Sequence, residues 1–158
     1  MYSPLHAAAG LTIVALVPNP ALSFPLAIAS HYLLDALPHG DMRKPPHVLQ
    51  VAEGRRLLIT ESIDLPLTGL VVWKLTTIFS SLSPLYLLAG AIAGILPDIL
   101  WGGKFVLEVL HVRLPGLTQF LDVHHRWHEW IHVKAPRDIP FYAGVAYHLV
   151  VVILLLSR

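Results

Sequence analysis

Cysteine is absent from this chain of 158 residues, and charged residues are scarce. Without cysteine, disulfides, thiolate metal sites and iron–sulfur clusters are excluded, so His, Asp or Glu must hold any metal. Only 13% of the residues are charged, whereas 55% are hydrophobic and the mean hydropathy is +0.64. Ordinary globular proteins have about 25% charged residues. A soluble chain of this size could not cover its surface with so few charges, so we expect an integral membrane protein.

Length, net charge and the N-terminus set further limits. The length fits one domain, residues 1–158. A net charge near +1 gives no general case for nucleic-acid binding, and we expect no nucleic-acid partner. The N-terminus lacks the basic region and small-residue cleavage site of a signal peptide. We therefore expect the first apolar run to be retained.

The apolar runs predict an all-α, polytopic membrane bundle. Five membrane-crossing helices are expected at about residues 4–17, 21–37, 57–79, 85–100 and 139–156. The fourth should end near Leu96-Pro97-Asp98, with a short amphipathic piece at 105–112 after it. An extra His-rich helix at about 118–132 should lie at the membrane interface, with Trp127 and Trp130 as anchors.

The distribution of basic residues predicts the topology. Nearly all Lys and Arg lie in the connections 38–56 and 102–138, and the turns 18–20 and 80–84 have none. Five spans place both basic connections on the side of the N-terminus. By the positive-inside rule that side is cytoplasmic. We therefore expect a multi-pass plasma-membrane protein with a cytoplasmic N-terminus and with membrane lipids as partners.

Two histidines and two aspartates gather where the second apolar run ends. His31 and Asp35 are four residues apart, so they share one face of a helix. His39 and Asp41 lie in the turn beyond it. Divalent transition metals are usually bound by histidine nitrogens and carboxylate oxygens that lie close together, as they would at this helix end. Segment 31–41 therefore predicts metal ligands.

Other ionisable residues fall at the same depth of the predicted bundle. His6 lies in the first helix near its start, Asp64 in the third helix and Asp98 at the end of the fourth. Acidic groups inside a membrane segment are costly unless they are paired or bound to metal. The pattern predicts a composite metal site at the cytoplasmic face. One ion can join Asp35, Asp98 and His128 only if their side chains lie within about 8–10 Å of one another.

A second dense cluster lies in the His-rich segment. His124, His128 and His132 recur every four residues and would line one helical face. Residues 128–132 also have the zincin spacing, with Glu129 as general base, although no third ligand follows at a recognised zincin distance. An interfacial amphipathic helix is the alternative, and it explains the tryptophans but not the period of the histidines.

At these motifs the chain resembles the YdjM-like family of bacterial inner-membrane, metal-dependent hydrolases. The shared pieces are His31-Tyr32-Leu33-Leu34-Asp35, Leu96-Pro97-Asp98, His125-Arg126-Trp127-His128 and the opening Ser3-Pro4-Leu5-His6 with Gly10. The family continues Leu-Pro-Asp with x-Asp-His, whereas residues 99–101 read Ile-Leu-Trp here, and the order of two motifs is reversed. A more distant likeness is to zinc-dependent phospholipase C and related nucleases, which have His-Tyr-x-x-Asp in a metal-binding helix.

The resemblance implies a hydrolase in a bacterial-type inner membrane, whereas the residues themselves argue only for a divalent metal, with Zn²⁺ the first choice. An enzyme would act on an ester or phosphoester of a lipid or lipid-linked substrate. The expected metal ligands are His31, Asp35, His39 and His128 first, then Asp41, Asp64, Asp98, His6 and His124. Glu129 or Asp64 would be the base, and Arg126 would hold a phosphate. Transport of protons or metal ions and a structural metal staple stay open as other functions.

Overall fold

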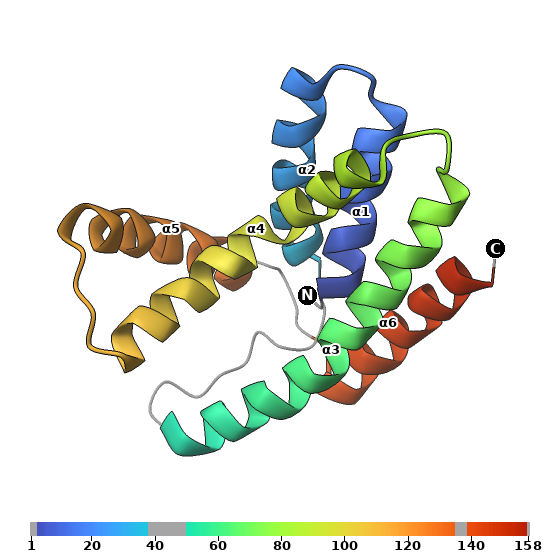
Figure 1. The fold of residues 1–158 in the computed structure, drawn as a ribbon. Helices are drawn as coiled ribbons and strands as arrows, with labels where there is room; N and C mark the ends of the chain where they lie inside the picture. The colour runs from blue at the N-terminus through green and yellow to red at the C-terminus, as the bar shows by residue number, and fades with distance from the viewer. Residues whose placement is uncertain (1–2, 38–49, 135–138, 158) are drawn as a thin grey trace.

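Six α-helices form the described part of the chain in this computed structural model (Figure 1). The structure describes residues 3–37, 50–134 and 139–157, and these residues contain no strand. The helices are α1 (Ser3–Leu16), α2 (Pro20–Asp35), α3 (Gln50–Ile78), α4 (Pro84–Val109), α5 (Pro115–Lys134) and α6 (Phe141–Leu156). The predicted all-α class is confirmed.

The sharp break between α1 and α2 follows from residues 17–20. Pro18 and Pro20 lack the backbone N–H that a continuing helix needs. Asn19 caps α2, because its side-chain oxygen accepts a hydrogen bond of 3.0 Å from the backbone N–H of Ala21. Pro20 occupies the start of the helix, where a missing N–H does no harm. The turn sends α2 back along α1 and brings the end of α2 beside the start of α1 (Figure 1).

The prediction that a helix ends near Leu96-Pro97-Asp98 was wrong, because α4 continues through Pro97 to Val109. Residues 105–109 of the separate piece expected at 105–112 are the end of this helix, and residues 110–112 follow it. Proline removes one backbone hydrogen bond of the turn before it. Pro97 is fully buried, however, and packing against the neighbouring helices outweighs that loss. Similarly, α3 begins at Gln50 rather than near residue 57, because its polar first turns do not show in an apolar pattern.

Three glycines let α1 and α4 approach closely at the centre of the molecule. Gly10 of α1 faces Gly90 and Gly94 of α4. A Cβ atom on Gly10 or Gly94 would collide with the backbone of the facing helix, and one on Gly90 would collide with the Val14 side chain. Small residues spaced in this way allow backbones to touch, as in packed membrane helices. The contact brings the backbone of His6 against Gly94.

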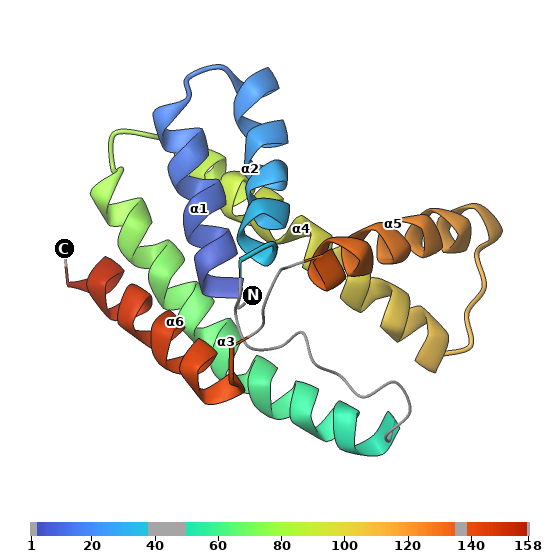
Figure 2. The same cartoon turned by 180° about the vertical axis from the view of Figure 1, so that it is seen from behind.

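The second half of α4 and the whole of α5 form an antiparallel pair that projects from the other helices (Figures 1 and 2). Among the described helices, α5 contacts only α2 and α4. Lys104 of α4 pairs with Glu108 at 3.1 Å and with Asp122 of α5 at 3.3 Å. Trp101 stacks on His125 with ring centroids 6.2 Å apart. The two contacts between α4 and α5, Lys104–Asp122 and Trp101–His125, set the orientation of the α5 face that carries the histidines.

Large apolar side chains are exposed on every described helix, for example Leu33 of α2 and Leu85 of α4. Within the described ranges, α4 is the one helix that has both the length and the hydropathy to cross a bilayer. Helix α1 and the segment Tyr142–Leu154 are apolar but shorter. The predicted arrangement of five membrane spans is therefore not confirmed and stays a proposal.

Candidate metal centre

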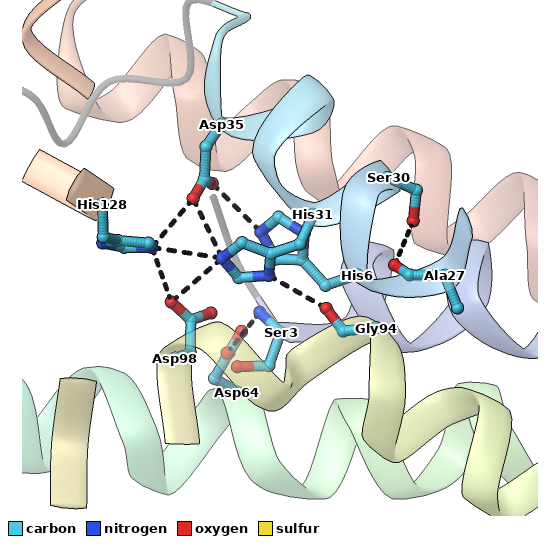
Figure 3. A network of polar contacts seen from close by, with 10 residues as sticks. All are labelled: Ser3, His6, Ala27, Ser30, His31, Asp35, Asp64, Gly94, Asp98 and His128. Carbon is cyan, nitrogen blue, oxygen red and sulfur yellow. Dashed lines mark hydrogen bonds and ion pairs between the residues drawn. The ribbon is translucent and has the colours of Figure 1, made fainter. Parts of the chain in front are cut away.

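Two histidines and two aspartates from three helices converge beside the start of α1 (Figure 3). His31 and Asp35 come from α2, Asp98 from α4 and His128 from α5. One ligand atom of each residue lies within 4.8 Å of the ligand atoms of the other three. His31, Asp35 and His128 are buried, whereas the Asp98 side chain is 34% exposed. The predicted convergence of Asp35, Asp98 and His128 is therefore present in the structure.

The distances within this cluster suit a single ion. Nε2 of His31 lies 3.2 Å from Nε2 of His128, 3.0 Å from Oδ2 of Asp35 and 3.5 Å from Oδ1 of Asp98. Nε2 of His128 lies 3.2 Å and 3.6 Å from the same two oxygens. Four atoms placed tetrahedrally at the usual zinc–ligand distances would be about 3.3–3.6 Å apart. The observed spacing is therefore close to that of four ligand atoms around one metal ion.

A hydrogen bond between α2 and α4 fixes the proton of His31. Nδ1 of His31 lies 2.9 Å from the carbonyl oxygen of Gly94, which can only accept, so Nδ1–H is the donor. In a neutral imidazole, Nε2 then carries a lone pair, and this lone pair faces the carboxylates of Asp35 and Asp98. A cation, either a proton or a metal ion, is needed to satisfy such a group of acceptors. Donation from the second ring nitrogen to a backbone carbonyl is typical of histidines that bind metal.

Charge balance also favours a divalent ion. Two carboxylates and two neutral imidazoles carry a charge of −2, which one divalent cation cancels. Cancellation matters here because three of the four side chains are buried, and an uncompensated charge is expensive away from water. Imidazole and carboxylate ligands suit several first-row divalent ions. The residues therefore fit a divalent metal as a class, and the choice of Zn²⁺ stays a proposal.

Two other predicted site residues lie beside the cluster rather than in it. His6 of α1 is fully buried, and its Nε2 lies 3.2 Å from Oδ1 of Asp35, the carboxylate oxygen not counted above. His124 of α5 stacks on His128 with ring centroids 5.7 Å apart, and its Nε2 lies 3.2 Å from the hydroxyl of Tyr32. Burial, and next the neighbouring His128, lower the pKa of His124 below its ordinary value. This residue therefore favours its neutral form.

The residues predicted to do acid–base or phosphate chemistry are not gathered with the four residues of the cluster. Asp64 of α3 accepts a hydrogen bond of 2.8 Å from the backbone N–H of Ser3, at the start of α1 (Figure 3). Glu129 is exposed, and its carboxylate lies 3.5 Å from Nε2 of His125 on the same helix. Arg126 is also exposed. Glu129 and Arg126 point elsewhere because residues next to His128 on a helix occupy other faces.

Some predicted ligands lie outside what the structure describes. His39 and Asp41 fall in the undescribed range 38–49, as does His47, and the side chain of His132 is not described either. The predictions for His39 and Asp41 stay predictions.

Two groups that support the site were not predicted. The first is the Gly94 carbonyl, which accepts a hydrogen bond from His31, and the second is the Tyr32 hydroxyl, which contacts His124. The spacing of Gly90 and Gly94, with Gly10 in another apolar run, was a signal for the close helix contact. Nothing in the sequence singles out Tyr32 as a partner of His124.

No protein-family model, curated protein or solved structure matches this chain. The likeness to the YdjM-like hydrolases is therefore carried by the short motifs alone. Four residues of those motifs, His31, Asp35, Asp98 and His128, meet in one cluster.

Proposed function

We propose that this protein is a membrane-embedded, metal-dependent hydrolase whose ion is held by His31, Asp35, Asp98 and His128. The observation that carries the proposal is the meeting of two imidazole nitrogens and two carboxylate oxygens from three helices within 4.8 Å. Such a group is costly to assemble beside apolar helices without a cation to join it. The motif resemblance to inner-membrane hydrolases supports the choice of activity.

The arrangement of exposed and buried ligands supports a reaction at this site. A bound divalent ion would polarise a carbonyl or phosphoryl oxygen and make water a better nucleophile. His31, Asp35 and His128 are shielded on the bundle side, whereas Asp98 is partly open to solvent. Water and substrate would therefore approach from the side of Asp98. Four protein ligands would fill a tetrahedral site, so a reaction here would require the ion to expand to five ligands, as some catalytic zinc sites do.

The outer face of α5 supports a lipid or lipid-linked substrate. Its exposed apolar residues recur every three or four positions, at Leu117, Phe120, Val123, Trp127 and Trp130. The two tryptophan rings stack on each other with centroids 5.4 Å apart. A helix with such a face is suited to lie in the headgroup layer of a membrane. We place the site at the cytoplasmic face of a bacterial-type inner membrane, with the N-terminus on that side and a lipid ester or phosphoester as substrate.

A structural metal centre is the second candidate, because one observation favours it. Helix α5 contacts only α2 and α4 among the described helices, and its His128 is the residue that would bind an ion held by both of them. An ion there would fasten the projecting helix to the bundle. In that case the metal would stabilise the fold without catalysing a reaction.

A direct test compares two carboxylate variants of α4. Asp98→Asn removes one proposed ligand, and Glu108→Gln removes an exposed carboxylate of the same helix that lies outside the cluster. The detergent-purified, metal-loaded chain is assayed against lipid esters and phosphoesters. We expect Asp98→Asn to lose more activity than the roughly 10–100-fold that loss of an outer-shell partner causes, and Glu108→Gln to retain it.

Two results would contradict the hydrolase. One is a metal-loaded wild type that hydrolyses none of these substrates. The other is an equal loss of activity in both variants. Metal binding without turnover, together with release of α5 in Asp98→Asn, would favour the structural centre.

A further inference from the structure

His6 is a fully buried polar side chain beside the cluster formed by His31, Asp35, Asp98 and His128. It is 0% exposed, and its ring stacks on the ring of His31 with centroids 3.9 Å apart and planes 25° apart. The helix that carries it is fixed against α4 by the glycine contact described above. The position of the His6 ring is therefore set by packing against α2, which carries His31, and against α4.

The surroundings of His6 favour one tautomer. Its Nε2 lies 3.2 Å from Oδ1 of Asp35. Both ring nitrogens are buried and make no hydrogen bond of good geometry to a described residue, but Nε2 has the Asp35 carboxylate within 3.2 Å. A proton on Nδ1 would be a buried donor without an acceptor, which is unfavourable. The neutral form with its proton on Nε2, the nitrogen that lies 3.2 Å from Asp35, is therefore the one that fits.

This contact gives the two oxygens of Asp35 different partners (Figure 3). Oδ1 faces His6, whereas Oδ2 lies 3.0 Å from Nε2 of His31 and 3.2 Å from Nε2 of His128. We infer that His6 is a positioning residue that holds Oδ1 of Asp35, so that Asp35 offers the metal a single oxygen. The inference rests on the proposed metal site.

The consequence concerns the space that remains around the ion. A carboxylate that is free to turn can bind a metal through both oxygens and occupy two positions instead of one. With Oδ1 held by His6, a second position around a bound ion would stay open for water or substrate. This role differs from the predicted one, in which His6 is itself a ligand; His6 lies outside the four residues whose ligand atoms come within 4.8 Å of one another.

The test uses Co²⁺ as the probe, because the strength of its visible absorption reports how many ligands surround it. The purified full chain is compared with His6→Gln, His6→Asn and His6→Leu, measuring the Co²⁺ spectrum and the Kd by competition with a chelator. The amide N–H of Gln reaches about the place of Nε2, whereas that of Asn reaches only the place of Nδ1. His148→Leu is the control, because it removes a buried histidine of α6 that is outside the cluster.

We expect His6→Gln and His148→Leu to keep the wild-type spectrum and Kd. His6→Asn and His6→Leu should bind Co²⁺ about 10–100-fold more weakly, as for other lost outer-shell partners. Their visible absorption should also weaken as Asp35 adds its second oxygen. The inference is overturned if His6→Gln and His6→Asn have the same Co²⁺ spectrum and Kd. It is also overturned if a folded His6→Leu keeps the wild-type spectrum. Failure of the wild type to bind Co²⁺ would instead contradict the metal site itself.

Discussion

Asp64 and Asp98 are carboxylates near the same end of the bundle, yet the structure gives them different partners. Asp64 is buried, and its Oδ2 accepts from the backbone N–H of Ser3, the first residue of α1. The first N–H groups of a helix have no partner within the helix, and they lie at its positive end. Asp98 faces two imidazole nitrogens instead. An acidic residue in an apolar segment can therefore cap a neighbouring helix as well as bind metal.

A substitution at Asp64 should separate these two roles. We expect Asp64→Ala to lower the free energy of unfolding by about 0.5–2 kcal/mol, because α1 loses the acceptor at its first N–H. The metal affinity should stay within a factor of two or so of wild type, because Asp64 is outside the cluster. Denaturant unfolding in detergent and chelator competition measure the two quantities. A large loss of affinity with unchanged stability would show that Asp64 acts on the metal.

At the scale of elements, the contact between α1 and α4 places the site. Gly94 contributes to the site in two ways. It has no side chain, so the backbone of His6 can lie against it, and its carbonyl accepts a hydrogen bond from His31. His31 and Asp35 of α2 meet Asp98 of α4 only because α1, α2 and α4 pack against one another. A change in the distance between α1 and α4 should therefore alter the distances among His31, Asp35 and Asp98.

Two glycine substitutions test this dependence. A Cβ at Gly94 would strike the backbone carbonyl of His6, so Gly94→Ala should cost about 1–3 kcal/mol of stability, as other overpacked sites do. It should also weaken metal binding. Gly69 of α3 has open space around it, and Gly69→Ala should instead add about 0.5–1 kcal/mol through helix propensity. Thermal unfolding of both variants measures the effect, and equal stabilities would contradict the proposed packing.

The sequence predicts those elements and residues that depend on local pattern. The four-residue spacing of His31 and Asp35, and the helical period through His128, follow directly from helix geometry. Acidic residues in apolar runs pointed to Asp98. The continuation of α4 through Pro97 was missed, because only burial of that proline against other helices explains it. The contact of His6 with Oδ1 of Asp35 was also missed, since it depends on the distance between two helices.

At the scale of the whole molecule, the apolar exterior is the main feature. Exposed leucine, isoleucine, valine and tryptophan side chains lie on all six described helices. Where exposed apolar side chains adjoin over a large area, they mark surfaces that contact a membrane or another protein. The two tryptophans of α5 lie on the same molecule as the metal cluster and on the same helix as His128. The proposed site would therefore lie at the membrane surface.

The membrane location has a simple test. We expect the expressed chain to stay with the membrane pellet after washing with alkaline carbonate and with high salt, because apolar surface rather than charge would hold it there. Release by salt alone would indicate a peripheral protein held by charge. Recovery of a monodisperse chain without detergent would contradict the membrane proposal.

The metal content of the purified chain tests the central claim most directly. The chain is expressed in medium containing Zn, Mn, Fe and Co, purified in mild detergent without chelator, and analysed for each metal by mass spectrometry. We predict close to one divalent ion per chain in the wild type and in Glu108→Gln, and little or none in a double variant of Asp35→Ala with His128→Ala. A folded wild type that holds no metal, before or after incubation with each of these ions, would contradict the account.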